Sequence, residues 1–221
     1  MKEYYQRVSD KVLLEHLESK GAVLIEGAKW CGKTTSAKHI AKSVIEMDRP
    51  DMTAQYQQMA RINPSNLLEG KVPHLIDEWQ IATNIWNAVR YEVDQRGEFG
   101  QFILTGSSVP AALDESMHTG TGRIVRMQMR PMSLFESKDS TGQVSLMDLF
   151  NKKDISTVDN HSIDEIAFLI CRGGWPAALN HGKKVALKQA FDYYDAVVND
   201  DISRVDRVKR DSERTKRILK S

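Results

Sequence analysis

Short apolar runs alternate with segments of helical periodicity along the first 130 residues of the chain. Five of the runs are short enough to be strands, at residues 22–26, 43–47, 72–77, 101–105 and 123–129. Between them, apolar residues recur at helical spacing, as in Ile85, Trp86, Val89 and Val93. Before the first run, Ser9 and the leucines after it predict a capped helix. Strands separated by helices are typical of a parallel sheet, so the pattern predicts a three-layer α/β core with a parallel five-stranded sheet.

The pattern changes after Pro131. Residues 137–161 are rich in Ser, Asp, Lys and Gly and predict a connector with one short helix near residues 146–150. From Ser162 onward the periodicity is helical again, and it ends in a charged segment without a stop signal. We therefore expect three parts: a core over residues 1–136, a connector over 137–161, and a helical lid over 162–221 that leads into a missing C-terminal domain.

A glycine-rich turn follows the first apolar run. Residues 27–34, Gly-Ala-Lys-Trp-Cys-Gly-Lys-Thr, fit the pattern G-x-x-x-x-G-K-[ST] at all four fixed positions, and a predicted helix comes next. Glycines let backbone N–H groups point inward, the helix N-terminus favours anions, and the lysine reaches the terminal phosphates. We therefore predict a nucleoside-triphosphate site with a phosphate loop formed by Gly27, Ala28, Lys29, Trp30, Cys31, Gly32, Lys33, Thr34 and Thr35.

A phosphate loop of this kind needs a metal ligand from another strand, and the third apolar run ends in Asp77 and Glu78. Asp77 is placed to hold Mg²⁺, directly or through water, together with the Thr34 hydroxyl. Glu78 could polarise a water for attack on the γ-phosphate. An acidic pair in a loop is ordinarily solvated surface. Because this pair directly follows a buried strand in a chain with a phosphate loop, we favour the functional interpretation.

The fourth apolar run also ends in polar residues, with Thr105 followed by Gly106, Ser107 and Ser108. The carboxyl ends of parallel strands face the ligand crevice of an open α/β sheet. Thr105, or alternatively Ser107, could therefore contact the γ-phosphate or position the attacking water. A plain turn would leave the same pattern.

An arginine is a further charge that phosphoryl transfer favours. Residues 118–123, His-Thr-Gly-Thr-Gly-Arg, form a glycine-rich segment that ends in Arg123 at the start of a predicted strand. Arg123 could reach the phosphates of its own site or those of a neighbouring copy. Arg126 and Arg130 compete for this role, and an arginine held in an ion pair at a strand end is the alternative.

Charge and cysteine content limit the partners. The formal net charge is +1, so nothing global favours nucleic acid. A local basic stretch could bind it, although interleaved acidic residues favour a solvated helix face; the stretch contains Arg204, Arg207, Lys209, Arg210, Arg214, Lys216, Arg217 and Lys220. The distant Cys31 and Cys171 imply neither a disulfide nor a zinc site, and no apolar run reaches membrane length. We expect a cytoplasmic protein with no membrane partner.

One motif points to a different base. Residues 151–154, Asn-Lys-Lys-Asp, match the guanine-specificity pattern N-K-x-D. A GTPase should also have D-x-x-G after its metal-binding aspartate, whereas this chain has Asp77-Glu78-Trp79-Gln80. We therefore assign residues 151–154 to the connector and expect adenine as the base.

Together these motifs resemble the AAA+ superfamily, and more narrowly the prokaryotic AAA-fold ATPases that are usually fused to a C-terminal nuclease-like domain of unknown function. The resemblance rests on residues 27–35, 75–80, 102–107, 118–123, 130–136 and 173–176. In related ATPases a glycine–proline turn opens the lid and approaches the adenine. The resemblance therefore implies nucleotide contacts from Gly174 and Pro176, with a structural turn as the alternative, and a lid sensor at Arg172.

The leading hypothesis is an ATP-binding, Mg²⁺-dependent ATPase. The catalytic residues would be Glu78, Lys33, Arg123 and Thr105, and the metal ligands would be Thr34 and Asp77. The first alternative is a nucleotide-gated switch or scaffold with little turnover, which could act through the lid, the missing domain and homo-oligomers on an unidentified protein partner. The second alternative is a nucleic-acid-handling ATPase that uses the basic stretch, with salt-sensitive binding.

Overall fold

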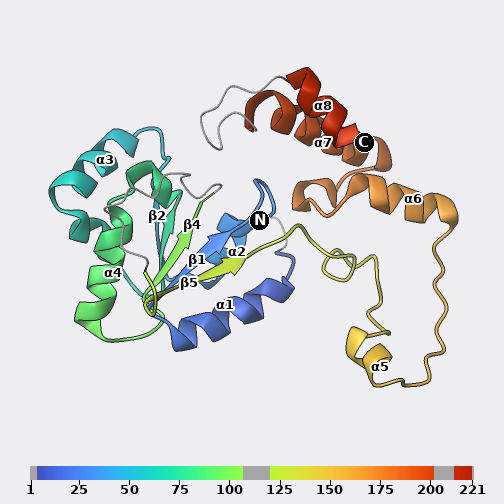
Figure 1. The fold of residues 1–221 in the computed structure, drawn as a ribbon, viewed down its shortest axis with the longest axis horizontal. Helices are drawn as coiled ribbons and strands as arrows, with labels where there is room; N and C mark the ends of the chain where they lie inside the picture. The colour runs from blue at the N-terminus through green and yellow to red at the C-terminus, as the bar shows by residue number, and fades with distance from the viewer. Residues whose placement is uncertain (1–3, 107–119, 202–211, 221) are drawn as a thin grey trace.

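The computed structural model describes residues 4–106, 120–201 and 212–220 (Figure 1). Its first part alternates helices and strands in the order α1 (Val8–Ser19), β1 (Ala22–Glu26), α2 (Lys33–Ile40), β2 (Ser43–Glu46), α3 (Thr53–Ile62), β3 (His74–Asp77), α4 (Ile85–Arg96), β4 (Phe102–Thr105) and β5 (Ile124–Gln128). All five strands predicted from the sequence are present, each within two residues of its expected bounds.

The strands form one parallel sheet in the order β2-β3-β4-β1-β5, which confirms the predicted fold class. Thr105 at the end of β4 is in register with Asp77 at the end of β3 on one side and with Ile25 of β1 on the other. Because these strands end level with one another, the segments that follow them leave the sheet at the same edge. The carboxyl edge therefore brings the candidate site residues together.

The side chains of each strand alternate between two apolar layers. Leu24 of β1 packs in a cluster with Trp86 of α4 on one face of the sheet. Its neighbour Val23 packs in a second cluster with Leu13 of α1 and Ala37 of α2 on the other face. All five side chains are at most 2% exposed. Because strand residues change sides with a period of two, one apolar run supplies both faces, and the three-layer prediction is confirmed.

The start of α1 differs from the sequence prediction. Arg7 is the N-cap, and its backbone N–H donates to Asp10 Oδ2 at 2.8 Å. Ser9 lies inside the first turn instead. The expectation of a Ser9 cap is wrong because the Asp10 carboxylate, which also accepts a hydrogen bond from the Tyr4 hydroxyl, takes part in the capping.

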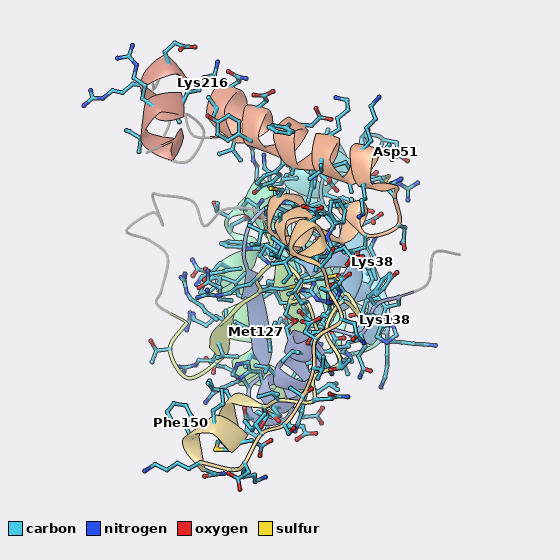
Figure 2. The ribbon with its side chains drawn as sticks, turned by 90° about the vertical axis from the view of Figure 1, so that its right-hand side faces the viewer. Lys38, Asp51, Met127, Lys138, Phe150 and Lys216 are labelled. Atoms are coloured by element: carbon cyan, nitrogen blue, oxygen red, sulfur yellow. The ribbon has the colours of Figure 1, made fainter. Side chains whose placement is uncertain are left out.

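The chain after β5 runs through the connector and returns as helices. The connector contains α5 (Leu146–Phe150) as predicted, and the exposed residues 151–154 follow it. The helical part contains α6 (Ile163–Arg172), α7 (Lys183–Ala196) and α8 (Ser212–Lys220). In Figure 1, α5 lies at the end of a loop that extends away from the sheet, and Figure 2 places Phe150 at the tip of this extension. The division into parts at residues 136 and 161 stays a prediction.

Several residues of interest lie outside the described ranges: Ser107, Ser108, His118, Thr119, Arg204, Arg207, Lys209 and Arg210. The described part of the basic stretch belongs to α8, where Lys216 pairs with Glu213 at 3.1 Å. Within residues 4–106, 120–201 and 212–220, no helix combines the length and the apolar character needed to cross a membrane.

Candidate functional site

The glycine-rich loop joins β1 to α2 at the carboxyl edge of the sheet. Gly27 lies so close to the exit of β5 that a Cβ would overlap the Met129 carbonyl oxygen. Gly32, the N-cap of α2, has φ 105°, which L side chains rarely adopt. The local backbone therefore requires both glycines of the motif. The loop leads into the first turn of α2, whose N–H groups have no acceptor within the helix.

Lys33 folds back onto this loop. Its Nζ donates to the carbonyl oxygens of Gly27 and Ala28 at 2.8 and 2.9 Å, and the residue is only 6% exposed. A hydrogen bond from an ammonium to an anionic oxygen is about twice as strong as a bond between neutral groups. The side chain is therefore placed to exchange a loop carbonyl for a phosphate oxygen.

A second cluster joins α2 to the ends of β3 and β4. The Thr34 hydroxyl donates to Asp77 Oδ1 at 2.8 Å, and the Thr105 hydroxyl donates to the same oxygen. Asp77 is 6% exposed. The register of β3 and β4 sets Thr105 beside Asp77, and the loop brings Thr34 to it. The structure thus brings together the predicted metal ligands and the predicted γ-phosphate-contacting threonine, which here orients the aspartate.

Glu78 follows at the end of β3 and lines the cavity described below. Its backbone has φ 54° and ψ 43°, the left-handed conformation, which costs a non-glycine residue about 1 kcal/mol or more. Burial raises the pKa of the Glu78 carboxyl; a hydrogen bond from Gln80 opposes this rise, and the negative charge of Asp77 adds to it. A carboxylate with a raised pKa in a cavity is suited to accept a proton.

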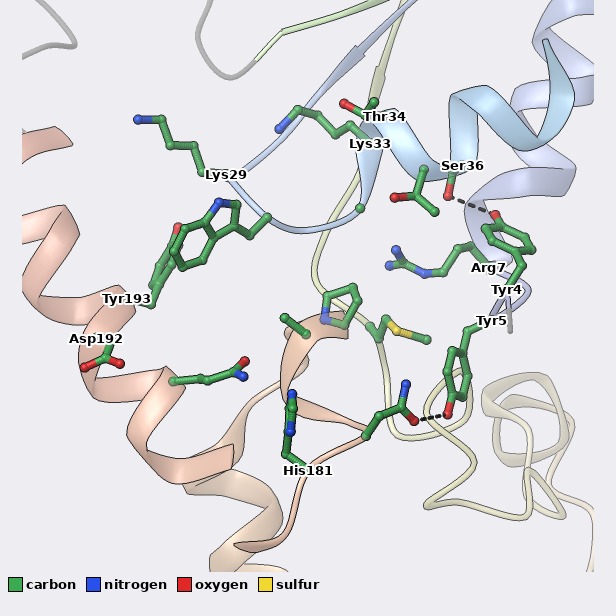
Figure 3. A pocket seen from close by; sticks show the side chains of 18 of the residues that line it. Tyr4, Tyr5, Arg7, Lys29, Lys33, Thr34, Ser36, His181, Asp192 and Tyr193 are labelled. Atoms are coloured by element: carbon green, nitrogen blue, oxygen red, sulfur yellow. Dashed lines mark hydrogen bonds between the residues drawn. The ribbon is translucent and has the colours of Figure 1, made fainter. Parts of the chain in front are cut away.

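A cavity of about 1300 Å³ opens over the loop and is large enough for a nucleoside triphosphate. Figure 3 shows Lys33 and Thr34 on one side of it and His181, Asp192 and Tyr193 of the helical part on the other. The predicted site residues that line it are Lys29, Trp30, Gly32, Lys33, Thr34, Thr35, Glu78 and Pro176. The cavity is therefore shared between the core and the helical part.

Cys31 faces away from this cavity. Its side chain is fully buried among the apolar residues beneath the loop, and its Sγ lies 3.7 Å from the Met129 carbonyl oxygen. Its carbonyl oxygen accepts a hydrogen bond from Arg7, so its backbone helps to fix the loop. Like Gly27 and Ala28, Cys31 therefore shapes the loop through its main chain.

Arg7 is a structural partner of the loop that sequence reasoning missed. Its Nη1 donates to the Cys31 carbonyl at 2.8 Å, its Nη2 donates to the Arg130 carbonyl at 2.8 Å, and its Nε pairs with Glu136 at 3.0 Å. Both side chains of the ion pair are buried. Arg7 therefore ties the loop to the exit of β5. No local pattern marks it, because Glu136 lies 129 residues away in the sequence.

An aromatic contact joins the loop to α7. Trp30 has φ 62° and is 63% exposed, and its ring centroid lies 6.0 Å from that of Tyr193. Tyr193 also packs against Trp175, with centroids 4.1 Å apart. The sequence placed Trp30 in the loop but did not reveal its contact. A large aromatic residue at a variable loop position was the only local sign of it.

The residues of the glycine–proline turn, and Arg172 before it, lie in different surroundings. Pro176 lines the cavity and lies within 3.6 Å of the position that a Cβ on Gly32 would take. Gly174 packs against the backbone of Met132, where a Cβ would overlap the carbonyl oxygen, and its own carbonyl accepts a hydrogen bond from Met132 N–H at 2.7 Å. Arg172 is buried in an ion pair with Asp139 at 2.7 Å. The structure thus places Pro176, but neither Gly174 nor Arg172, on the cavity wall.

The structure does not bring Arg123 to the phosphate loop of its own chain. Arg123 precedes β5, whose first residue pairs with the first residue of β1, so it lies at the amino edge of the sheet, opposite the loop. Its Nε pairs with Asp94 at 2.8 Å. Arg126 pairs with Glu26 at 2.8 Å, and Arg130 follows β5 on the carboxyl side. Any role of Arg123 in phosphate chemistry therefore requires a neighbouring copy.

Comparison with known families gives one match. A family model described as an AAA domain matches residues 19–138, which is more than half of the chain. The matched range contains the glycine-rich loop, the Asp77–Glu78 pair and Thr105. No curated protein sequence matches the chain.

Solved structures that are similar to the chain include the following three. The FIGL-1 AAA domain in complex with ADP has 15% identity and a TM-score of 0.48 over 91% of this chain and 76% of that chain. A STAND protein with a tetratricopeptide repeat sensor, PH0952 from Pyrococcus horikoshii, has 14% identity and a TM-score of 0.46 over 87% of this chain and 33% of that chain. C. elegans PCH-2 has 17% identity and a TM-score of 0.40 over 83% and 55%. The matched region thus spans about a third of the STAND protein, and at these TM-scores the likenesses add nothing to the assignment of the site.

Proposed function

The chain belongs to the AAA domain family of the AAA+ P-loop ATPases, and from this premise we propose that it binds ATP with Mg²⁺ and hydrolyses ATP to ADP and phosphate. One observation carries the proposal. The Thr34 hydroxyl donates a hydrogen bond to the Asp77 carboxylate. Glu78, the next residue after Asp77, lines the cavity. Hydrolysis needs a phosphate-binding group, a metal ligand and a base at one place, and the residues that we propose for these three roles lie together at the carboxyl edge of the sheet.

The residues at this edge fit a magnesium ion. Thr34 and Asp77 present hard oxygen donors that already share a hydrogen bond. Within the described residues no three His, Cys, Asp or Glu side chains gather into a metal-binding group. Mg²⁺ suits such a sparse set, because it keeps several waters and takes its other ligands from substrate phosphates. When bound, the ion would neutralise charge that develops on the β- and γ-phosphates.

Each residue then has a role in the proposed reaction. Lys33 and the backbone of the loop hold the phosphates, and Thr105 keeps Asp77 oriented. Glu78 accepts a proton from the water that attacks the γ-phosphate, a role favoured by its cavity position and raised pKa. Arg123 of a neighbouring copy would complete the site. Pro176, positioned by Gly174, contacts the nucleotide from the helical part.

Steady-state phosphate release separates the ATPase from a protein that only binds ATP. Glu78→Gln removes the base but keeps the shape of the side chain. It should lower the hydrolysis rate by about a hundredfold or more while ATP still binds. Lys33→Ala should weaken ATP binding itself. Equal rates at background level for wild type and Glu78→Gln, with ATP bound by both, would reject hydrolysis.

A nucleotide-gated switch with slow turnover is a second candidate, favoured by the contact of Trp30 in the loop with Tyr193 in α7. Because the cavity has one wall on each part, a nucleotide could change how the helical part sits on the core. Such a switch predicts tight ATP binding with background turnover. It also predicts a nucleotide-dependent change in tryptophan fluorescence that is lost in Trp30→Phe.

A further inference from the structure

We propose that Gln80 is a positioning residue for the proposed reaction, which acts by holding the carboxylate of Glu78. The proposal rests on the hydrolysis of ATP proposed above. Glu78 lines the cavity, whereas Gln80 is not among the residues that line it. Gln80 therefore contacts the base rather than the substrate.

The backbone around Glu78 is anchored. Glu78 begins a 3₁₀ turn over Trp79–Ala82, and its carbonyl oxygen accepts a hydrogen bond from Ile81 N–H at 3.0 Å. Trp79 is 1% exposed and packs on Trp86 of α4, with ring centroids 5.3 Å apart. The turn is therefore fixed to the core. Its glutamate side chain still has three rotatable bonds and needs a partner to hold one rotamer.

Gln80 provides that partner. Its Nε2 donates to Glu78 Oε2 from two residues along the turn. A carboxylate has two oxygens, and a bond to one of them orients the group while the other oxygen stays available for a proton. The Gln80 amide thus selects one carboxylate orientation without consuming the oxygen that general-base chemistry requires.

The slot that holds Gln80 is built by Gly106 at the end of β4. A Cβ at Gly106 would overlap Gln80 Oε1. This oxygen is buried, and within the described part of the chain it has no hydrogen-bond partner. A buried amide oxygen without a hydrogen-bond partner is costly, and in a native structure such a group calls for an explanation. The amide Nε2 donates to Glu78, and this is the contact that a positioning role requires.

Two substitutions break this contact from different segments, the 3₁₀ turn that holds Gln80 and the residue that follows β4. Gln80→Ala removes the amide, and Gly106→Ala fills the slot and displaces it. Each should lower kcat by about tenfold to a hundredfold, because a misplacement of about 1 Å in a reacting group costs up to that much. KM and the equilibrium affinity for ATP should change less than about twofold. Because both remove the same contact, the double variant should lose no more than the single ones.

Gln57→Ala is the matched control. Gln57 also supports this turn, since its Nε2 donates to the Ile81 carbonyl at 3.4 Å, but it does not touch Glu78. It should keep kcat within about twofold of wild type, and melting curves should show all variants folded. A wild-type kcat in Gln80→Ala, while Glu78→Gln is inactive, would overturn the positioning role alone, and so would equal losses in Gln80→Ala and Gln57→Ala. Identical rates for wild type and Glu78→Gln would instead overturn the hydrolysis on which it rests.

Discussion

The sheet core and the helical part bury their apolar residues very differently. In β1, Val23 and Ile25 are fully buried. In α6, Ile163 is 85% exposed and Ile170 is 75% exposed, and Phe150 of α5 is 74% exposed. The core therefore buries its apolar side chains, whereas the connector and α6 leave a large share of their apolar side chains exposed to solvent. The residues proposed for chemistry belong to the part whose geometry is fixed by packing.

The two parts meet at a few specific contacts. Met132 N–H donates to the Gly174 carbonyl at 2.7 Å, and the Tyr5 hydroxyl donates to Asn180 Oδ1 at 2.8 Å. The Trp30–Tyr193 ring contact is another. We infer that the core determines the chemistry of the cavity and that these contacts determine how the helical part closes it.

The largest expected difference between the two parts is in stability. Leu24→Ala in β1 should lower the free energy of unfolding by about 3 kcal/mol, because it leaves a cavity between packed layers. Ile163→Ala in α6 should change it by less than about 0.5 kcal/mol, because the side chain is already in solvent. Denaturant unfolding measures both. A similar loss for the two variants would mean that α6 is covered in solution.

Loss of the contact between Trp30 and Tyr193 should have a smaller effect than Leu24→Ala, and the effect should be on the affinity for ATP. Trp30→Ala removes a ring that lines the cavity beside Tyr193, and because an aromatic contact is worth about 0.5–1.5 kcal/mol, ATP should bind about two- to tenfold more weakly. Tyr193→Ala should give a similar loss, and kcat should stay near the wild-type value in both, because neither ring touches Glu78. Titration with a fluorescent ATP analogue measures the affinity. A loss of kcat at unchanged affinity would contradict the separation of roles.

The smallest expected effect is the acid sensitivity of the Arg7–Glu136 ion pair, which lies where the core leads into the connector. Burial raises the pKa of Glu136, but hydrogen bonds from Ser133 and Val8 N–H and the charge of Arg7 outweigh this and hold the pKa below its ordinary value of 4.5. The folded pKa is depressed, so the stabilisation is complete above pH 4.5 and is lost as the pH falls through the folded pKa.

Between the folded and the unfolded pKa of Glu136, the wild type should lose stability as the pH falls. Glu136 should contribute a slope of at most about 1.4 kcal/mol per pH unit. Glu136→Gln cannot ionise, so its unfolding free energy should lack this component although it is lower at neutral pH. Unfolding curves at several acidic pH values test this. Parallel pH dependence of the two proteins would show that Glu136 does not contribute.

The sequence predicted the candidate site residues best where they stand at the carboxyl end of a strand. Asp77 and Thr105 each close an apolar run, and in a parallel sheet the ends of neighbouring runs meet at one edge. The same rule explains why Arg123 does not reach the loop of its own chain: it precedes its strand, so it lies at the opposite edge, and its role at a neighbouring copy stays a prediction. Arg7 could not be found in this way, because its partner Glu136 is distant in the sequence and their contact depends on the whole fold.

The helical part shows the other limit. The helical periodicity from Ser162 onward predicted α6, and the resemblance to related ATPases implied the glycine–proline turn at residues 173–176. Whether Gly174 or Pro176 faces the cavity depends on how this turn lies against Met132, and no local pattern encodes that. Elements could therefore be predicted from local spacing, but contacts between the two parts could not.

Single-turnover hydrolysis tests the central claim, that the core edge formed by Lys33, Thr34, Asp77 and Glu78 cleaves ATP. Protein in excess of labelled ATP and Mg²⁺ is quenched over time, and bound nucleotide is measured in the same sample. Wild type should convert bound ATP to ADP, and Glu78→Gln should retain bound ATP and convert it about a hundredfold more slowly or worse. Conversion at the same rate in both proteins, or no conversion of ATP bound by wild type, would contradict the account.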